Sequence, residues 1–208
     1  MISNNPQAPN NPWGGTLQFE APHLQLAQAE LFSLLQQYSF KRGDFTLASG
    51  AKSTWYLDCR VTALHGRGSL LIGQLFNHVV HNLPQGTTVQ AVGGMALGAA
   101  PLVSAVTVAS AMAGNPINGF LVRKEAKLYG GGKQIEGNLP VSGNIILVED
   151  VVTTGGSTIK AINAIKQQAP HLTIVGVLAL VDRNAGGAEQ FKALHVPFHA
   201  LYNVQAFL

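Results

Sequence analysis

Two adjacent acids, followed by a turn rich in hydroxyl groups and glycine, are the residues of this chain best suited to chemistry. Glu149 and Asp150 follow an apolar run, and the turn 153–158 has the sequence TTGGST. Glycines let backbone N–H groups face a common point, and the start of a following helix adds unpaired N–H groups. This pattern favours a phosphate ligand. The alternative is an ordinary glycine-capped turn, which would leave the paired acids without a purpose.

The two acids need a partner of their own beside a phosphate. Ribose hydroxyls or a hydrated Mg²⁺ would supply one. The apolar run 145–148 before the acids predicts a strand buried on both faces, and open α/β sheets bind ligands at the carboxyl ends of such strands. A sugar with a 5′-phosphate, two ring hydroxyls and a metal-bound pyrophosphate satisfies the acids and the turn together.

The segment 148–157, with the sequence VEDVVTTGGS, resembles the phosphoribosyl pyrophosphate (PRPP) motif of the type I phosphoribosyltransferases. About ten ordered positions take part, so the match is more specific than a lone glycine triplet. The resemblance implies that Glu149 and Asp150 are catalytic and orient the ribose hydroxyls. The PRPP-binding residues that it implies in this segment are Glu149, Asp150, Val151, Val152, Thr153, Thr154, Gly155, Gly156 and Ser157.

A second pattern lies in the segment 45–58, FTLASGAKSTWYLD. Alternating apolar residues on either side of a serine–glycine pair predict a β-hairpin, and Lys41 just before it has the character of a surface charge. The pattern also resembles the amino-terminal signature of the orotate phosphoribosyltransferases. That resemblance implies a hood over the site, in which Lys41 reaches PRPP and Tyr56 and Leu57 contact the orotate ring.

The segment 123–137 combines four cations with a run of three glycines. Its composition suits either a polyphosphate ligand or a solvated charge run. Its order resembles the catalytic loop of the same family, which closes over the site of the neighbouring subunit in a dimer. The resemblance implies that Lys127 is catalytic and that PRPP is contacted by Arg123, Lys124, Lys127 and Tyr129. Many relatives have a histidine in place of Tyr129.

Two further strand ends carry implied contacts. A strand at 88–92 is expected to end in a glycine pair, with a helix beginning at Met95, and the resemblance implies that Ala96 and Leu97 touch PRPP through the backbone. Arg183 follows the apolar run 173–181. In isolation its pairing with Asp182 suits a simple salt bridge. The resemblance implies that the orotate carboxylate is bound by Arg183, with Thr153 completing the orotate site.

Strand and helix patterns alternate from about residue 69 onward, which predicts an α/β fold with a parallel twisted sheet flanked by helices. A single domain is expected, with a small hood at 21–65 and a core at 66–208, after a flexible tail at 1–20. Further helices are expected at 24–38, 69–82, 159–167 and 186–194, and further strands at 119–122 and 198–202.

Composition narrows the partners of the 208-residue chain. Its net charge of +3 is spread widely outside 123–133, which favours an anionic small molecule over nucleic acid. Cys59 is the only cysteine, which fits a reducing cytoplasm and a small buried side chain better than a nucleophile. The apolar stretch 91–113 is interrupted by glycine and proline, so a buried strand and helix are expected rather than a membrane span.

The resemblance implies transfer of a phosphoribosyl group from PRPP to orotate in pyrimidine biosynthesis. It also implies Mg²⁺ bound through PRPP and water rather than by side chains, and a cytoplasmic homodimer that shares the loop 123–137. Two alternatives remain open. A purine phosphoribosyltransferase would keep the motif 148–157 without needing Arg183. A PRPP-sensing regulator would add a DNA-binding segment, for which the sequence offers no helix-turn-helix or basic helix.

Overall fold

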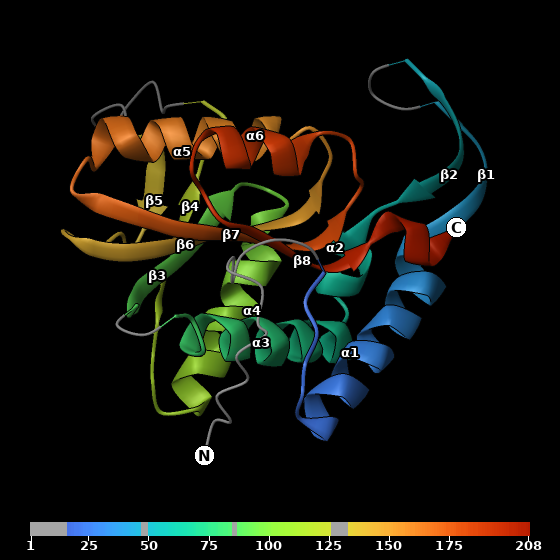
Figure 1. The fold of residues 1–208 in the computed structure, drawn as a ribbon, viewed down its shortest axis with the longest axis horizontal. Coiled ribbons are helices and arrows are strands. Elements are labelled where there is room, and N and C mark those ends of the chain that lie inside the picture. The colour runs from blue at the N-terminus through green and yellow to red at the C-terminus, as the bar shows by residue number, and fades with distance from the viewer. Residues whose placement is uncertain (1–15, 47–49, 85–86, 126–132) are drawn as a thin grey trace, which may run out of the picture.

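A six-stranded sheet lies at the centre of the computed structural model, which describes residues 16–46, 50–84, 87–125 and 133–208 (Figure 1). The strand order is β5-β4-β3-β6-β7-β8, and all neighbouring pairs are parallel except β4 and β5, which are antiparallel. The predicted parallel sheet is therefore confirmed, with β5 as an unforeseen antiparallel edge. The bounds are β3 Val89–Met95, β4 Asn118–Val122, β5 Ile135–Gly137, β6 Gly143–Val152, β7 Leu172–Asp182 and β8 Phe198–Asn203.

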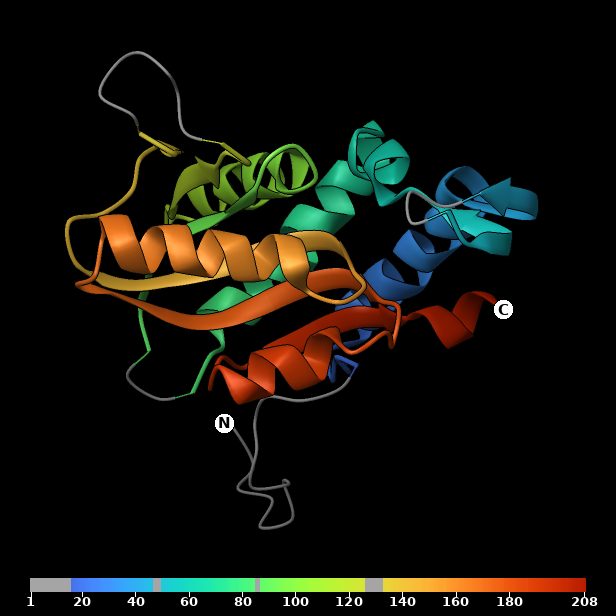
Figure 2. The same cartoon turned by 90° about the horizontal axis from the view of Figure 1, so that it is seen from above.

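Helices cover both faces of the sheet (Figure 2). Helices α5 (Gly156–Gln168) and α6 (Gly187–Ala193) lie on one face, and α3 (Gly66–His81) and α4 (Ala99–Met112) lie on the other, with α1 (Pro22–Leu34) packed against α3. A hydrophobic core lies on each face of the sheet. Strand β6 contributes side chains to both cores, because its side chains point alternately to the two faces. Ile146 and Val148 belong to the core under α3 and α4, whereas Ile145 and Leu147 belong to the core under α5 and α6.

A two-stranded antiparallel hairpin stands apart from the main sheet. It consists of β1 (Phe40–Thr46) and β2 (Lys52–Leu57), and it follows α1 through a π-helical turn, Leu35–Ser39. The predicted hairpin is confirmed. A short helix that the sequence patterns did not indicate, α2 (Cys59–Ala63), comes directly after it, and Asp58 caps this helix by accepting the N–H of Arg60 at 3.1 Å.

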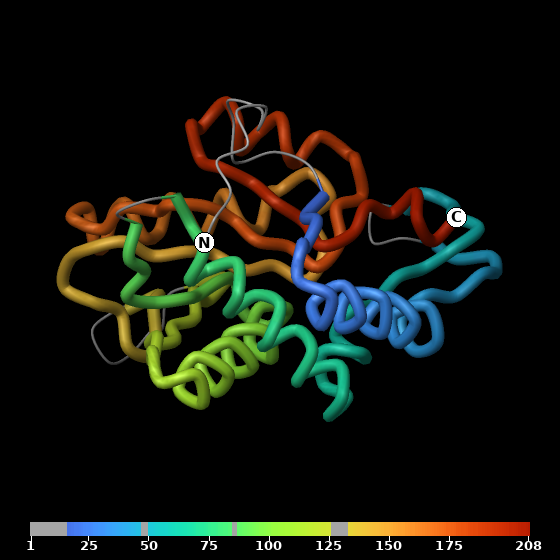
Figure 3. The backbone as a smooth tube through the Cα atoms, turned by 60° about the horizontal axis from the view of Figure 1, so that its bottom comes forward, coloured from blue at the N-terminus to red at the C-terminus, as the bar shows by residue number. Residues whose placement is uncertain are grey.

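The described chain begins on β8 rather than in a tail (Figure 3). Thr16 bridges Ala200 in parallel, the N–H of Leu17 donates to Ala200 O at 2.9 Å, and Phe19 is buried. Residues 16–20, which were predicted to be flexible, are therefore held by backbone hydrogen bonding and apolar burial. Residues 1–15 lie outside the described residues.

The predicted start of a helix at Met95 was wrong. Strand β3 continues through Met95, and α4 begins at Ala99. The glycines serve close packing within the strand: a Cβ at Gly93 would lie 2.3 Å from the ring of Phe120, and one at Gly94 would lie 2.3 Å from Val148 O. Glycine read as a turn signal therefore ended the predicted strand too early.

None of the helices in the described part of the chain is both long and apolar enough to cross a membrane. The stretch 91–113, in which a buried strand and helix were expected, forms most of β3 and all of α4.

Candidate functional site

The candidate site lies where β6, β3 and β7 end, because parallel strands bring their carboxyl ends to one edge of the sheet. Glu149 and Asp150 come from β6, the turn 153–155 leads from β6 into α5, and Arg183 follows β7. The backbone N–H of Arg183 donates to Val152 O at 2.9 Å, which fixes the two strand ends together.

The turn 153–155 that leads into α5 is fixed by a backbone hydrogen bond, while its hydroxyl side chains are exposed to solvent. Gly155 adopts φ 75° at the N-cap of α5, and the N–H of Gly187 donates to Thr153 O at 3.0 Å. Thr153, Thr154 and Ser157 are exposed, and no side chain caps the first turn of α5. The unpaired N–H groups and the positive end of the helix dipole therefore face solvent, where they suit a phosphate.

We expect Gly155→Ala to destabilise the protein. An alanine there needs the left-handed region at a cost of roughly 1–2 kcal/mol, and its Cβ would lie 2.9 Å from the ring of Phe191. For a chain of 208 residues, that corresponds to a fall in Tm of roughly 2–8 °C. The measurement is thermal unfolding followed by circular dichroism.

The matched control is Gly156→Ala. Gly156 lies inside α5, and the nearest atom to its Cβ would be Thr154 Oγ1 at 3.7 Å, which is an ordinary contact. We expect this variant to keep a Tm close to the wild-type value. Equal losses in the two variants would contradict the role of the left-handed backbone at Gly155.

Glu149 is buried, although it was predicted to orient ribose hydroxyls. Its Oε2 accepts the hydroxyls of Ser157 at 3.0 Å and Thr158 at 2.8 Å. Burial, reinforced by the neighbouring Asp150, raises the pKa of Glu149 to about 7. Thr158 belongs to the hydroxyl-rich turn 153–158 that the sequence favoured for a phosphate, but it is buried and its hydroxyl instead ties α5 to β6.

Stability should depend on pH through Glu149. Its pKa in the folded state, about 7, lies above its ordinary value of 4.5. Between these values the folded chain holds a proton that the unfolded chain releases, so the contribution is complete below pH 4.5 and is lost as pH rises through 7. Glutamine is neutral and still accepts both hydroxyls. We therefore expect Glu149→Gln to raise Tm relative to wild type at pH 8 and to change it little at pH 5. Parallel wild-type and variant curves across this range would contradict the shift.

Asp150 is the more exposed acid of the pair. Its Oδ1 accepts the N–H of Val151 at 2.9 Å, and a Cβ at Gly98 would lie 2.7 Å from the same oxygen. The loop after β3 therefore lies against this carboxylate, and glycine leaves the space for it. Burial raises the pKa of Asp150, while Arg60 acts in the opposite direction.

The loop after β3 brings Ala96 and Leu97 to the same edge of the sheet. The two residues are joined by a cis peptide bond. The N–H of Ala96 already donates to Val122 O at 2.8 Å, whereas Leu97 is exposed. Leu97 is therefore the better placed of the two for the predicted backbone contact with PRPP.

The three predicted site residues of the hairpin differ in their exposure. Lys41 pairs with Tyr56 across β1 and β2, and both side chains are exposed, whereas the side chain of Leu57 is buried. Because successive residues of a strand point to opposite faces, Lys41 and Tyr56 share the face opposite Trp55. The structure does not show these two side chains converging with Arg183, whose Cζ lies 4.4 Å from the Trp55 ring.

The cationic segment is described only in part. Arg123 and Lys124 are exposed, and Arg123 Nη1 lies 3.1 Å from Glu136 Oε1 on β5. The predicted site residues Lys127 and Tyr129 lie outside the described residues. Cys59 is fully buried, and burial raises the pKa of its thiol well above the usual range, which confirms it as a packing residue.

Sequence reasoning missed three residues that shape the site: Gly98, Arg60 and Trp55. Gly98 leaves room for Asp150, Arg60 donates to both oxygens of Asp58 at 2.8 and 2.7 Å, and Trp55 contacts Arg183. The arginine and the tryptophan lie in or beside the signature segment, so their position was a signal, but no pattern indicated what they contact.

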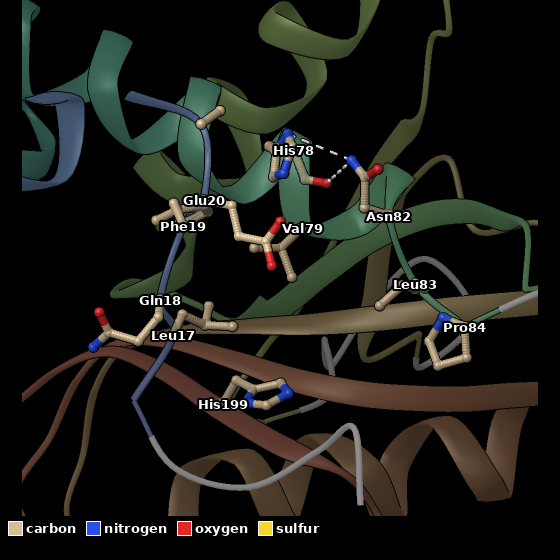
Figure 4. A pocket seen from close by; sticks show the side chains of 11 residues that line it. Leu17, Gln18, Phe19, Glu20, His78, Val79, Asn82, Leu83, Pro84 and His199 are labelled. Carbon is tan, nitrogen blue, oxygen red and sulfur yellow. Dashed lines mark hydrogen bonds between the residues drawn. The ribbon is translucent and has the colours of Figure 1, made fainter. Parts of the chain in front are cut away.

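A hollow of about 680 Å³ lies away from the candidate site, toward the amino ends of β3 and β8 (Figure 4). It is next to the carboxyl end of α3, where Asn82 donates to His78 O at 2.7 Å. The negative end of the α3 dipole disfavours a phosphate there, so this hollow does not compete for the role of the site. Its lining residues are Leu17, Gln18, Phe19, Glu20, Ala21, His78, Val79, Asn82, Leu83, Pro84 and His199.

No group of three or more histidine, cysteine, aspartate or glutamate side chains suited to a metal ion occurs in the parts of the chain that the structure describes. The carboxylate oxygens at the site come from Glu149 and Asp150, and Glu149 Oε2 already accepts two hydroxyls.

Comparison with known proteins gives a consistent result, although no family model matches the chain. The chain is 41% identical over 181 residues to an orotate phosphoribosyltransferase of Rhodopirellula baltica, covering 86% of this chain and 93% of the relative. It is 42% identical over 176 residues to that of Thermosynechococcus vestitus, covering 84% and 89%. The Mycobacterium tuberculosis H37Rv orotate phosphoribosyltransferase in complex with PRPP superposes with a TM-score of 0.71 at 34% identity, covering 87% of this chain and 98% of that one.

Proposed function

The chain belongs to the orotate phosphoribosyltransferase family, and we propose how its own residues divide the work of the reaction. The reaction transfers the 5-phosphoribosyl group from PRPP to orotate, giving orotidine 5′-monophosphate and pyrophosphate in pyrimidine biosynthesis. The bond from C1 of the ribose to the pyrophosphate breaks, and positive charge develops on the ribose ring. Catalysis is then mainly a matter of position and electrostatics.

The observation that carries the proposal is that an uncapped helix start, a carboxylate and a guanidinium lie at one edge of the sheet. The uncapped first turn of α5 and the exposed hydroxyls of Thr153 and Thr154 suit the 5′-phosphate. Asp150 suits the ribose hydroxyls and the positive charge that develops beside them. Arg183 suits the orotate carboxylate, because a guanidinium can donate two parallel hydrogen bonds.

The cationic segment supplies the pyrophosphate contacts in this proposal. Arg123 and Lys124 hold the leaving group, and Lys127 stabilises the charge that grows on it. Arg123 must then exchange its exposed contact with Glu136 for the ligand, at little cost because exposed ion pairs are weak. Closure of 123–137 over the site would exclude water, which otherwise hydrolyses PRPP.

The side chains of the site would supply only some of the ligands of a Mg²⁺ ion, and the substrate would supply others. Asp150 offers one partly exposed carboxylate, and Mg²⁺ in proteins is commonly bound by one or two carboxylates together with substrate phosphates and water. When bound, the ion would offset charge on the pyrophosphate. We also propose a cytoplasmic homodimer in which 123–137 serves the neighbouring subunit.

The test is the ultraviolet absorbance of orotate after PRPP and Mg²⁺ are added to the purified protein. We expect orotate to be consumed and pyrophosphate to appear in equal amount. Omitting Mg²⁺ tests the metal requirement. Hypoxanthine and adenine replace orotate in parallel assays, and consumption of a purine with orotate untouched would overturn the assignment.

A further inference from the structure

The guanidinium of Arg183 lies against an aromatic ring rather than a carboxylate. Its Cζ is 4.4 Å from the centroid of the Trp55 ring, well within the range of a cation–π interaction. Within the described ranges, none of the salt bridges involves Arg183. The side chain is partly buried. A positive charge is therefore held at the edge of the sheet, and no acid among the described residues pairs with it.

The polar groups next to Arg183 fix its backbone rather than its guanidinium. Asp182 Oδ1 accepts the N–H of Asn184 at 2.9 Å, and Asn184 Oδ1 accepts Asn203 Nδ2 at 2.8 Å. The N–H of Arg183 donates to Val152 O. The pairing of Asp182 with Arg183 that the sequence alone allowed is not formed.

Trp55 is itself supported on both its backbone and its ring. Its N–H and carbonyl oxygen are both bonded to the hydroxyl of Ser53, at 3.4 and 2.7 Å. Its ring stacks on Phe40, with ring centroids 6.1 Å apart and an angle of 28° between the planes. Phe40 in turn contacts Phe207 of the 3₁₀ helix η2 (Val204–Phe207), with ring centroids 5.7 Å apart. The ring that meets Arg183 therefore has a fixed orientation.

We propose that Trp55 is a positioning residue for orotate recognition, because its ring fixes the guanidinium of Arg183 while leaving the edge of that group to the ligand. The inference rests on the proposed function, in which Arg183 binds the orotate carboxylate. Trp55 touches neither substrate in this proposal and acts through Arg183 alone.

The choice of a ring over an acid has a physical reason. A carboxylate neighbour would hold Arg183 by accepting its in-plane N–H donors, which the orotate carboxylate also needs. An aromatic ring contacts the face of the guanidinium, so the five N–H donors at the edge stay available. Because Trp55 belongs to β2 and Arg183 follows β7, the contact also sets the position of the hairpin against the sheet.

The test is a double-mutant cycle on Trp55 and Arg183, measured by initial rates with each substrate varied in turn. We expect Trp55→Leu to raise the KM for orotate about threefold to thirtyfold, the range expected of a cation–π contact. The KM for PRPP should stay within about twofold of wild type, as for a site that the change does not touch. Trp55→Phe, which keeps an aromatic face, should restore most of the orotate affinity.

In an Arg183→Ala background, Trp55→Leu should change the KM for orotate no further, because the two effects act through one contact. Additive effects, or equal rises in both KM values, would overturn the proposal and leave Trp55 a packing residue. If Trp55→Leu unfolds, Trp55→Met keeps an apolar side chain without a ring and takes its place in the cycle. A wild-type protein that consumes orotate, together with an unchanged KM in the ring-less variant, would refute this inference but not the function.

Discussion

Replacing Arg183 with alanine is expected to raise the KM for orotate by roughly 30- to 1,000-fold while the KM for PRPP changes little. Truncating one member of a partly buried, hydrogen-bonded charge pair costs about 2–4 kcal/mol, most of it from leaving the other charge unpaired. Here the other charge is the carboxylate of orotate. The guanidinium makes no ion pair in the described structure, so its loss breaks no salt bridge there.

Arg183→Lys separates charge from geometry. Lysine keeps the positive charge but cannot donate two parallel hydrogen bonds, so we expect it to recover only part of the affinity. The control is Arg67→Ala, which removes an arginine of α3 that pairs with Glu30 of α1. That variant should keep the wild-type KM for orotate. A similar KM in wild type and Arg183→Ala would remove Arg183 from the orotate site.

Replacing Asp150 with asparagine is expected to lower kcat/KM for PRPP by about 100- to 1,000-fold at pH 7. A unit charge about 4 Å from the developing positive charge of the ribose is worth up to about 4 kcal/mol at an effective dielectric constant near 20. Asparagine keeps the size and an acceptor oxygen for the N–H of Val151 but removes the charge. Steady-state rates at varied PRPP, with circular dichroism to check folding, make the measurement.

Glu149→Gln should cost less activity than Asp150→Asn, even though the acids are neighbours. Glu149 is buried, its Oε2 already accepts two hydroxyls, and its raised pKa of about 7 leaves it partly protonated at neutral pH. Glu30→Gln, an exposed acid on α1, serves as the neutral control. If Glu149→Gln proved the more damaging change, the two acids would have been assigned the wrong way round.

The strands and helices of the core were largely readable from local patterns. Apolar runs such as 145–148 and 173–181 mark strands that are buried on both faces. Their side chains point alternately to the two faces of the sheet, and each face packs against a hydrophobic core. The predicted end of β3 was wrong where a glycine is required by contacts with distant parts of the chain. Gly93 and Gly94 lie within β3, and they are glycines because Phe120 and Val148 O leave no room for a Cβ. No local pattern could show that.

The sequence by itself determined the motif 148–157, the hairpin and the order of the elements, because chain-local patterns and short ordered motifs encode them. Only the tertiary structure decided how the acids differ. Burial and the hydroxyls of α5 engage Glu149, whereas Asp150 stays at the open edge beside Gly98. It also decided that Arg183 meets Trp55 from across the fold. Burial and contact between residues more than a hundred positions apart follow from the packing of distant elements, which no local spacing records.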